Sequence, residues 1–106
     1  MEKVDQLQKL KIQLGIKQSD DSQDDELKLL LDDVETDLLT WTNRTELPVT
    51  LDSTQRQISV IRYNKQGVEG ESSHSEGGIS RSFDDLPKGL QDSILQKRLA
   101  KLVTYQ

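Results

Sequence analysis

Ser22 to Trp41, SQDDELKLLLDDVETDLLTW, is the stretch of sequence that decides the fold. Its large apolar residues recur at helical spacing and form one stripe, which consists of Leu27, Leu30, Leu31, Val34, Leu38 and Trp41. The residues from Ser22 to Asp25 resemble a capping box with the shorter acid, and the acidic first turn suits the positive end of a helix dipole. The stretch therefore predicts a long amphipathic helix.

Two large apolar residues of this helix, Leu29 and Leu39, lie off the stripe. They predict a second contact surface, either with another helix of the same chain or with a neighbouring subunit. Trp41 continues the stripe, so we interpret it as a core or subunit-interface residue in preference to a ligand-stacking one.

The residues before the long helix predict a shorter one. Val4, Leu7, Leu10 and Leu14 follow one another at helical spacing, and Gly15 with Ile16 supplies a left-handed stop followed by an apolar residue. The first helix is therefore expected to end at Leu14.

A break at residues 43–48, NRTELP, separates the long helix from a third helix over residues 51–65. Its apolar residues fall on two faces, with Leu51, Ile58 and Ile61 on one and Val60 and Tyr63 on the other. Gly67 is expected to end this helix.

The segment over residues 67–82 carries four glycines and five serines, and its only large apolar residues are Val68 and Ile79. A segment of this composition cannot bury a core, so we predict a long mobile loop or a two-stranded arm.

Regular structure is expected to resume at residues 84–87, because acids and a proline at the first helical position both favour a helix start. The last helix would carry Leu90, Ile94, Leu95, Leu99 and Leu102, with Lys97, Arg98 and Lys101 near its C-terminal end, where the dipole favours cations. The predicted fold class is all-α, a small helical bundle of about four helices with a long Gly/Ser-rich arm between the last two. One domain covers residues 1–106.

The composition predicts a thin core and an acidic surface. Only 32% of the residues are apolar and the net charge is -5. A thin core makes oligomerisation, which buries further surface, a natural expectation. Residues 20–37 carry nine acids and one lysine, so phosphate-driven binding of nucleic acid is disfavoured.

Several function classes find no support in the sequence. The chain has no cysteine, no apolar run long enough to cross a bilayer and no apolar stretch at its N-terminus, so we expect a soluble, cytosolic protein. His74 lies among serines, but the sequence contains no nucleophile-elbow motif. The acids from Asp20 to Glu26 lack the spacing and the glycine of a calcium-binding loop. Gly77-Gly78 does not lie within a phosphate-binding loop motif. We predict no catalytic residue, no cofactor and no metal site.

The joint order of several short segments resembles the head-to-tail connector, or DNA-packaging adaptor, family of tailed bacteriophages. The segments are Leu10-Lys11-Ile12 to Gly15-Ile16, Asp24-Asp25-Glu26-Leu27, Trp41-Thr42-Asn43-Arg44 with Leu47-Pro48, Val60-Ile61-Arg62-Tyr63-Asn64, Gly67 to Glu69-Gly70, Ser75-Glu76-Gly77-Gly78-Ile79-Ser80 with Phe83, and Leu86-Pro87. The resemblance runs from about residue 7 to residue 100, with Trp41 at a position where the family is expected to have Tyr or another aromatic.

The resemblance implies a structural head-completion protein, not an enzyme, that forms a ring, commonly of twelve copies, beneath the portal. Such a ring extends the DNA channel and links the head to the next head-completion or tail protein. DNA would pass through without specific binding, no membrane would be involved, and the protein would belong to the virion, and to the host cytoplasm during assembly.

We assign candidate contacts on this basis. Val68, Ile79, Ser80 and Phe83 are candidates for the arm or a subunit interface. Lys97, Arg98 and Lys101 are candidates for contact with an acidic surface on the portal or on an adjacent subunit. The alternative hypotheses are a small DNA-binding regulatory module of a mobile element, which needs a basic recognition helix, and a small hydrolase with His74 as base.

Overall fold

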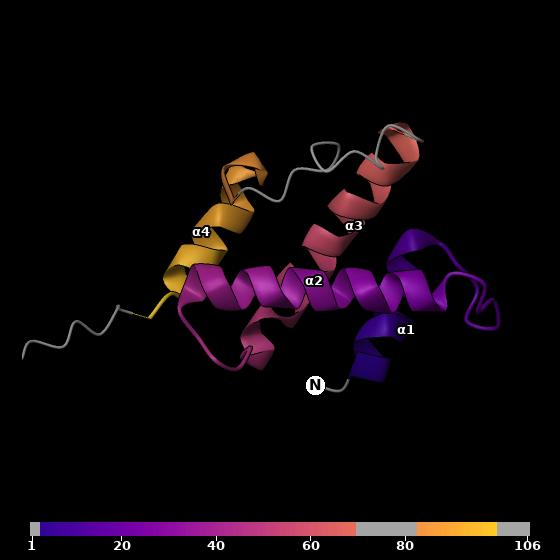
Figure 1. Cartoon of the computed structure of the whole chain (residues 1–106), viewed down its shortest axis with the longest axis horizontal. Helices are drawn as coiled ribbons and strands as arrows, with labels where there is room; N and C mark the ends of the chain where they lie inside the picture. Colours follow the sequence, from indigo (N-terminus) through magenta and orange to yellow (C-terminus); the bar gives the residue numbers. More distant parts are fainter. Residues whose placement is uncertain (1–2, 70–82, 100–106) are drawn as a thin grey trace, which may run out of the picture.

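The computed structural model describes residues 3–69 and 83–99, and this part of the chain is all-α, as predicted (Figure 1). Its elements are α1 (Lys3–Leu14), α2 (Asp24–Thr42), the 3-10 turn η1 (Val49–Leu51), α3 (Asp52–Glu69), the 3-10 turn η3 (Phe83–Asp85) and α4 (Lys88–Gln96).

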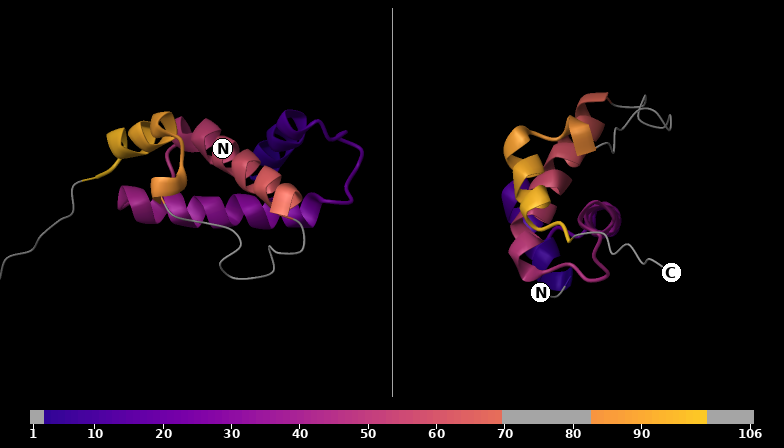
Figure 2. Two further views of the ribbon diagram at one scale, coloured as in Figure 1. Left: turned by 90° about the horizontal axis from the view of Figure 1, so that it is seen from above. Right: turned by 90° about the vertical axis from the view of Figure 1, so that its left-hand side faces the viewer.

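The helices form two layers, with α2 on one side and α1, α3 and α4 on the other (Figure 2, left). Both α2 and α3 pack against each of the other helices. The first helix, α1, lies near the N-terminal end of α2, and α4 lies near its C-terminal end (Figure 1). The long helix therefore acts as the common support for the other three.

The apolar core consists of two clusters along α2. The α1-side cluster contains the buried residues Leu7, Leu10, Leu27 and Leu31, with Leu14, Ile16, Val60 and Tyr63 packed against them. The α4-side cluster contains Val34, Leu38, Ile58, Leu86, Leu90 and Ile94, with Trp41, Leu47, Ile61 and Phe83 packed against them. The predicted stripe of α2 is confirmed, because five of its residues are buried and Trp41 is half-buried.

The two predicted faces of α3 are also confirmed, and each serves a different cluster. Ile58 and Ile61 join the α4-side cluster, whereas Val60 and Tyr63 pack against the α1-side cluster. The helix thus bridges the two halves of the core.

The predicted stop after α1 is confirmed. Gly15 adopts a left-handed conformation with φ of 77°, and the amide of Ile16 donates to the carbonyl of Lys11 at 2.9 Å. Asn43 ends α2 in the same way, with φ of 57°. Both stops use a residue that tolerates positive φ to satisfy the last carbonyls.

The predicted capping box is wrong. Gln23 occupies the N-cap of α2 and makes no side-chain capping bond. Ser22 is two residues before the helix, and its amide and hydroxyl both donate to Oδ1 of Asp20, at 3.0 and 2.7 Å. This local turn uses the serine that would otherwise cap the helix.

The predicted end of the third helix is also wrong, since α3 continues through Gly67 to Glu69. A glycine inside a helix costs only about 1 kcal/mol relative to alanine, so it does not by itself stop one. Residues 67–69 of the predicted arm are therefore helical, and the rest of the arm lies outside the described residues.

The last helix is shorter than predicted and begins one residue later. Pro87 is at the N-cap, and α4 ends at Gln96 with Lys97 as its C-cap. The backbone then bonds to α2, because the amide of Leu99 donates to the carbonyl of Thr42 at 2.9 Å. Lys97 is thus the C-cap of α4 and Arg98 follows it, so both lie near the C-terminal end of the helix but outside its last turn.

Leu38 tests the placement of the core on α2, because its side chain is fully buried in the α4-side cluster. We expect Leu38→Ala to lower the free energy of unfolding by about 2–5 kcal/mol, measured by urea denaturation. Leu29→Ala, which shortens an exposed leucine of the same helix, should change it by less than about 0.5 kcal/mol. Equal losses for the two variants would contradict this packing.

Candidate functional site

A network of buried polar side chains lies between α1, α2 and α3. Gln6 donates from Nε2 to Oε1 of Gln55 at 2.9 Å and to the carbonyl of Asp52 at 3.0 Å. Gln55 in turn donates to the carbonyl of Leu31, and Arg56 donates to Oε1 of Gln6 at 2.7 Å. Both glutamine side chains have defined hydrogen-bond partners. The network therefore stabilises the packing of the helices and sets the position of α1 along α3.

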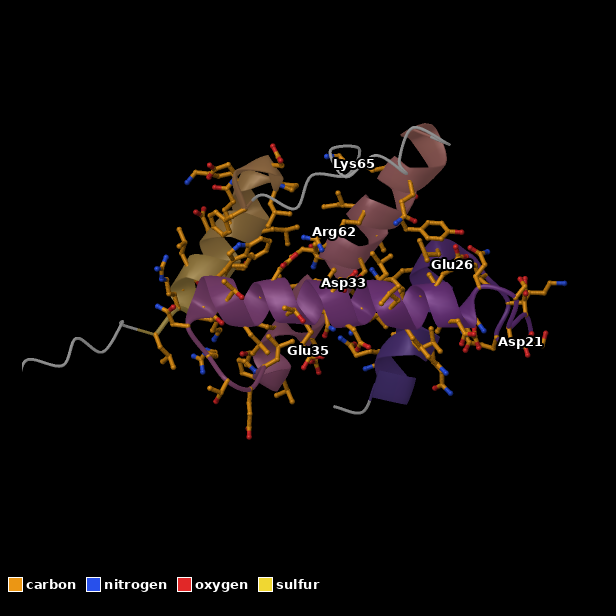
Figure 3. All side chains as sticks on the ribbon, viewed as in Figure 1. Asp21, Glu26, Asp33, Glu35, Arg62 and Lys65 are labelled. Carbon is orange, nitrogen blue, oxygen red and sulfur yellow. The ribbon has the colours of Figure 1, made fainter. Side chains whose placement is uncertain are left out.

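A second buried polar contact connects α3 to α2. Nη2 of Arg62, whose side chain is 5% exposed, donates to Oδ2 of Asp37 at 2.7 Å. Arg62 extends from α3 toward α2 in Figure 3. The ion pair belongs to the interior between the two layers, and its cation is not available to an external ligand.

One end of the molecule is acidic. Asp21 and Glu26 lie at the N-terminal end of α2 (Figure 3), together with the exposed Asp20 and Asp25. The hydrogen bond from the hydroxyl of Ser22, supported by the bond from its amide, lowers the pKa of Asp20, which keeps that carboxylate ionised.

The buried ammonium of Lys11 lies behind this acidic end. Its Nζ is 2.9 Å from Oδ1 of Asp24 and donates to the carbonyl of Gln18 at 3.1 Å. Lys11 is therefore occupied in holding the loop over residues 15–23 against α1, and it neutralises only one of the carboxylates.

The opposite end of α2 lies beside Lys97 and Arg98, the two residues of the predicted basic set that the structure describes. Nε of Arg44 donates to the carbonyl of Lys97 at 2.8 Å, and Nδ2 of Asn43 donates to the carbonyl of Leu99 at 3.1 Å. These bonds hold Lys97 and Arg98 beside the end of α2 and leave Arg98 exposed.

An aromatic pair lies next to this basic end. The rings of Trp41 and Phe83 meet edge to face, with centroids 5.5 Å apart and an angle of 71° between their planes. The pair borders a hollow of about 210 Å³, which is lined by Thr40, Trp41, Phe83, Leu95 and Arg98. We call this feature the aromatic hollow.

A larger groove of about 590 Å³ separates α3 from α4. Its apolar lining residues include Leu51, Val60, Ile61 and Leu90, and most of the others carry hydroxyl or amide side chains. Lys97 is the single charged residue of the lining. The lining contains no carboxylate, histidine or thiol, so Lys97 has no acidic or basic side chain beside it in the groove that could form a catalytic pair.

The described residues contain no group of three carboxylate, histidine or cysteine side chains that could hold a metal ion. Within the same ranges, no helix is long and apolar enough to span a membrane. His74 lies outside the described residues, so the structure does not test the hydrolase hypothesis.

The predicted contact residues have different outcomes. Phe83 packs on Trp41 of its own chain, and Val68 is in the last turn of α3. Ile79, Ser80 and Lys101 lie outside the described residues. The aromatic hollow was not predicted, because Trp41, Phe83 and Leu95 are far apart in sequence and no local pattern connects them.

The DNA-binding hypothesis finds little support in the described residues. It requires a basic recognition helix, and the only candidate was the last one. The last turn of α4 contains no basic residue. Lys97 and Arg98 lie in the segment that follows, so this helix does not present a basic face to a groove of DNA.

These features define a small all-α protein whose distinctive parts are charged ends, an aromatic hollow and a groove. The sequence matches the phage gp6-like head-tail connector protein family over residues 4–98, so the chain belongs to that family. The family is structural and not catalytic, which confirms the prediction that the protein is not an enzyme. No curated protein and no solved structure matches the chain.

The ion pair of Arg62 and Asp37 can be compared with an exposed pair, Lys88 and Asp92, which are 3.2 Å apart on α4. We expect Arg62→Met to lower the free energy of unfolding by about 2–3 kcal/mol, because it removes the buried cation of an ion pair between the two layers. Lys88→Met should cost less than about 0.5 kcal/mol. Guanidinium denaturation of both variants measures the difference, and a cost for Arg62→Met as small as that for Lys88→Met would contradict the structural role of the buried pair.

Proposed function

We propose that the protein is a head-completion subunit that forms a ring, dodecameric in the virion, below the portal of a tailed bacteriophage. The ring extends the DNA channel and links the head to the next head-completion or tail protein. The observation that carries this proposal is the family match over residues 4–98.

The charge of the chain supports a channel through which DNA passes without being held. The net charge is -5, and nine acids lie within residues 20–37. Strong binding to DNA requires cations that replace the counterions of the phosphates, and an acidic ring supplies few of them. Repulsion between an acidic wall and DNA favours movement over retention.

Exposed apolar side chains support assembly into a ring. Among the described residues, five large apolar ones remain substantially exposed in the single subunit: Ile12, Leu29, Val49, Leu95 and Leu99. Neighbouring copies can cover such side chains, and a closed ring gives every copy the same two contacts.

The candidate contacts retain their proposed roles. Val68, Ile79, Ser80 and Phe83 belong to the arm or to a subunit interface. Lys97, Arg98 and Lys101 contact an acidic surface on the portal or on an adjacent subunit. The protein is a virion component that is assembled in the host cytoplasm.

Assembly of the purified protein tests the proposal. We expect light scattering to show monomers in dilute solution, and negative-stain electron microscopy to show rings at high concentration or on addition of the portal protein. Individually weak contacts become strong when a ring closes, because the last contacts are intramolecular. A stable dimer at all concentrations, with no binding to the portal, would contradict the proposed function.

The proposed arm yields a separate test. We expect deletion of residues 72–78 to leave the far-ultraviolet circular dichroism and the melting temperature nearly unchanged, because this segment contains no large apolar residue that could be buried in a core. Ring formation should be lost. If the deletion prevents folding, the segment belongs to the core and its assignment as an assembly arm is wrong.

A further inference from the structure

Leu29 is an exposed leucine in an acidic setting. Its side chain is 62% exposed and points away from the stripe that α2 buries. Positions three and four residues away on a helix are its neighbours on the surface, and here they are Asp25, Glu26, Asp32 and Asp33. The outer face of α2 therefore presents one apolar side chain within a ring of carboxylates.

The aromatic hollow has the complementary character. Trp41, Phe83 and Leu95 give it apolar walls, and Leu95 is itself 48% exposed. The exposed guanidinium of Arg98 stands at its edge, and no acidic residue lines it. Its volume of about 210 Å³ is below the roughly 300–1,000 Å³ of small-molecule pockets and suits one inserted aliphatic side chain.

Leu29 cannot fill the hollow of its own chain. Leu29 and Trp41 lie on the same continuous helix, and their separation of twelve positions corresponds to about 18 Å along its axis. The two features keep this separation as long as α2 is intact, so they can meet only between two copies.

We propose that Leu29 of one subunit inserts into the aromatic hollow of the next subunit, with Arg98 facing the carboxylates around that leucine. This contact joins two different surfaces of the same protein, so it is heterologous and can be repeated around a closed ring. A buried apolar anchor with a charged rim is the usual arrangement of a strong protein contact. The inference rests on the proposed ring and identifies one of its interfaces.

The first test compares two exposed residues. Leu29→Glu places a charge in the apolar hollow, and we expect it to weaken ring assembly by at least about tenfold in sedimentation velocity experiments over a concentration series. The matched control is Gln8→Glu, which places the same charge at an exposed position on α1, outside the set of exposed apolar residues, and should assemble like the unchanged protein. Circular dichroism should show both variants folded, since neither side chain is buried.

The second test exchanges charges. Glu26→Arg and Arg98→Glu should each weaken assembly by about three- to tenfold at low salt, because each places like charges on both sides of the contact. The double variant restores an opposite pair at every interface and should recover most of the loss. Only direct apposition of the two residues predicts this recovery.

The outcomes separate the inference from the proposed function. If the unchanged protein forms no ring, with or without the portal, the proposed function fails and the inference fails with it. If the unchanged protein forms rings and Leu29→Glu forms them equally well, only the inference is overturned. Rings of Leu29→Glu that form normally but no longer bind the portal would assign Leu29 to the portal, which also overturns the inference.

Discussion

Burial of the single apolar stripe of α2 is the constraint on which the rest of the structure depends. Three helices cover the stripe: α1 packs on its first half, α4 packs on its second half, and α3 crosses both. Hydrophobic burial is proportional to area and has no direction, so it explains the compaction but not the exact positions of these helices. The core is consequently split into two small clusters, and neither cluster involves all four helices.

The positions are set by polar groups between the clusters. Gln6 and Gln55 connect α1, α3 and the backbone of α2, and Arg62 pairs with Asp37 across the two layers. A buried amide or guanidinium that loses its partner is costly, so a small shift of one helix would leave several groups unsatisfied. The polar contacts therefore favour one arrangement among the many that apolar burial alone would allow.

A subunit with so small a core leaves apolar side chains at its surface, and their charged neighbours suggest how they are used. Carboxylates dominate the first half of α2, whereas Arg44, Lys97 and Arg98 gather at its other end, held there by bonds between the segment after α4 and the end of α2. Opposite charges at two ends of one subunit favour head-to-tail contacts and disfavour symmetric pairing of like ends. This polarity is consistent with the proposed ring of a connector protein.

The sequence by itself determined the elements and the class of the protein. Periodicity located four helices, the stripe of α2 and the two faces of α3, because helical spacing is a local property. The sequence segments also indicated the connector family, which the match over residues 4–98 confirms. Local signals misplaced the cap of α2 and the ends of α3 and α4, where Ser22 bonds to Asp20, Gly67 remains helical and Leu99 bonds to Thr42. Only the tertiary structure decided that Trp41, Phe83 and Leu95 surround one hollow beside Arg98, because contacts between distant residues depend on how the helices pack and leave no periodic trace in the sequence.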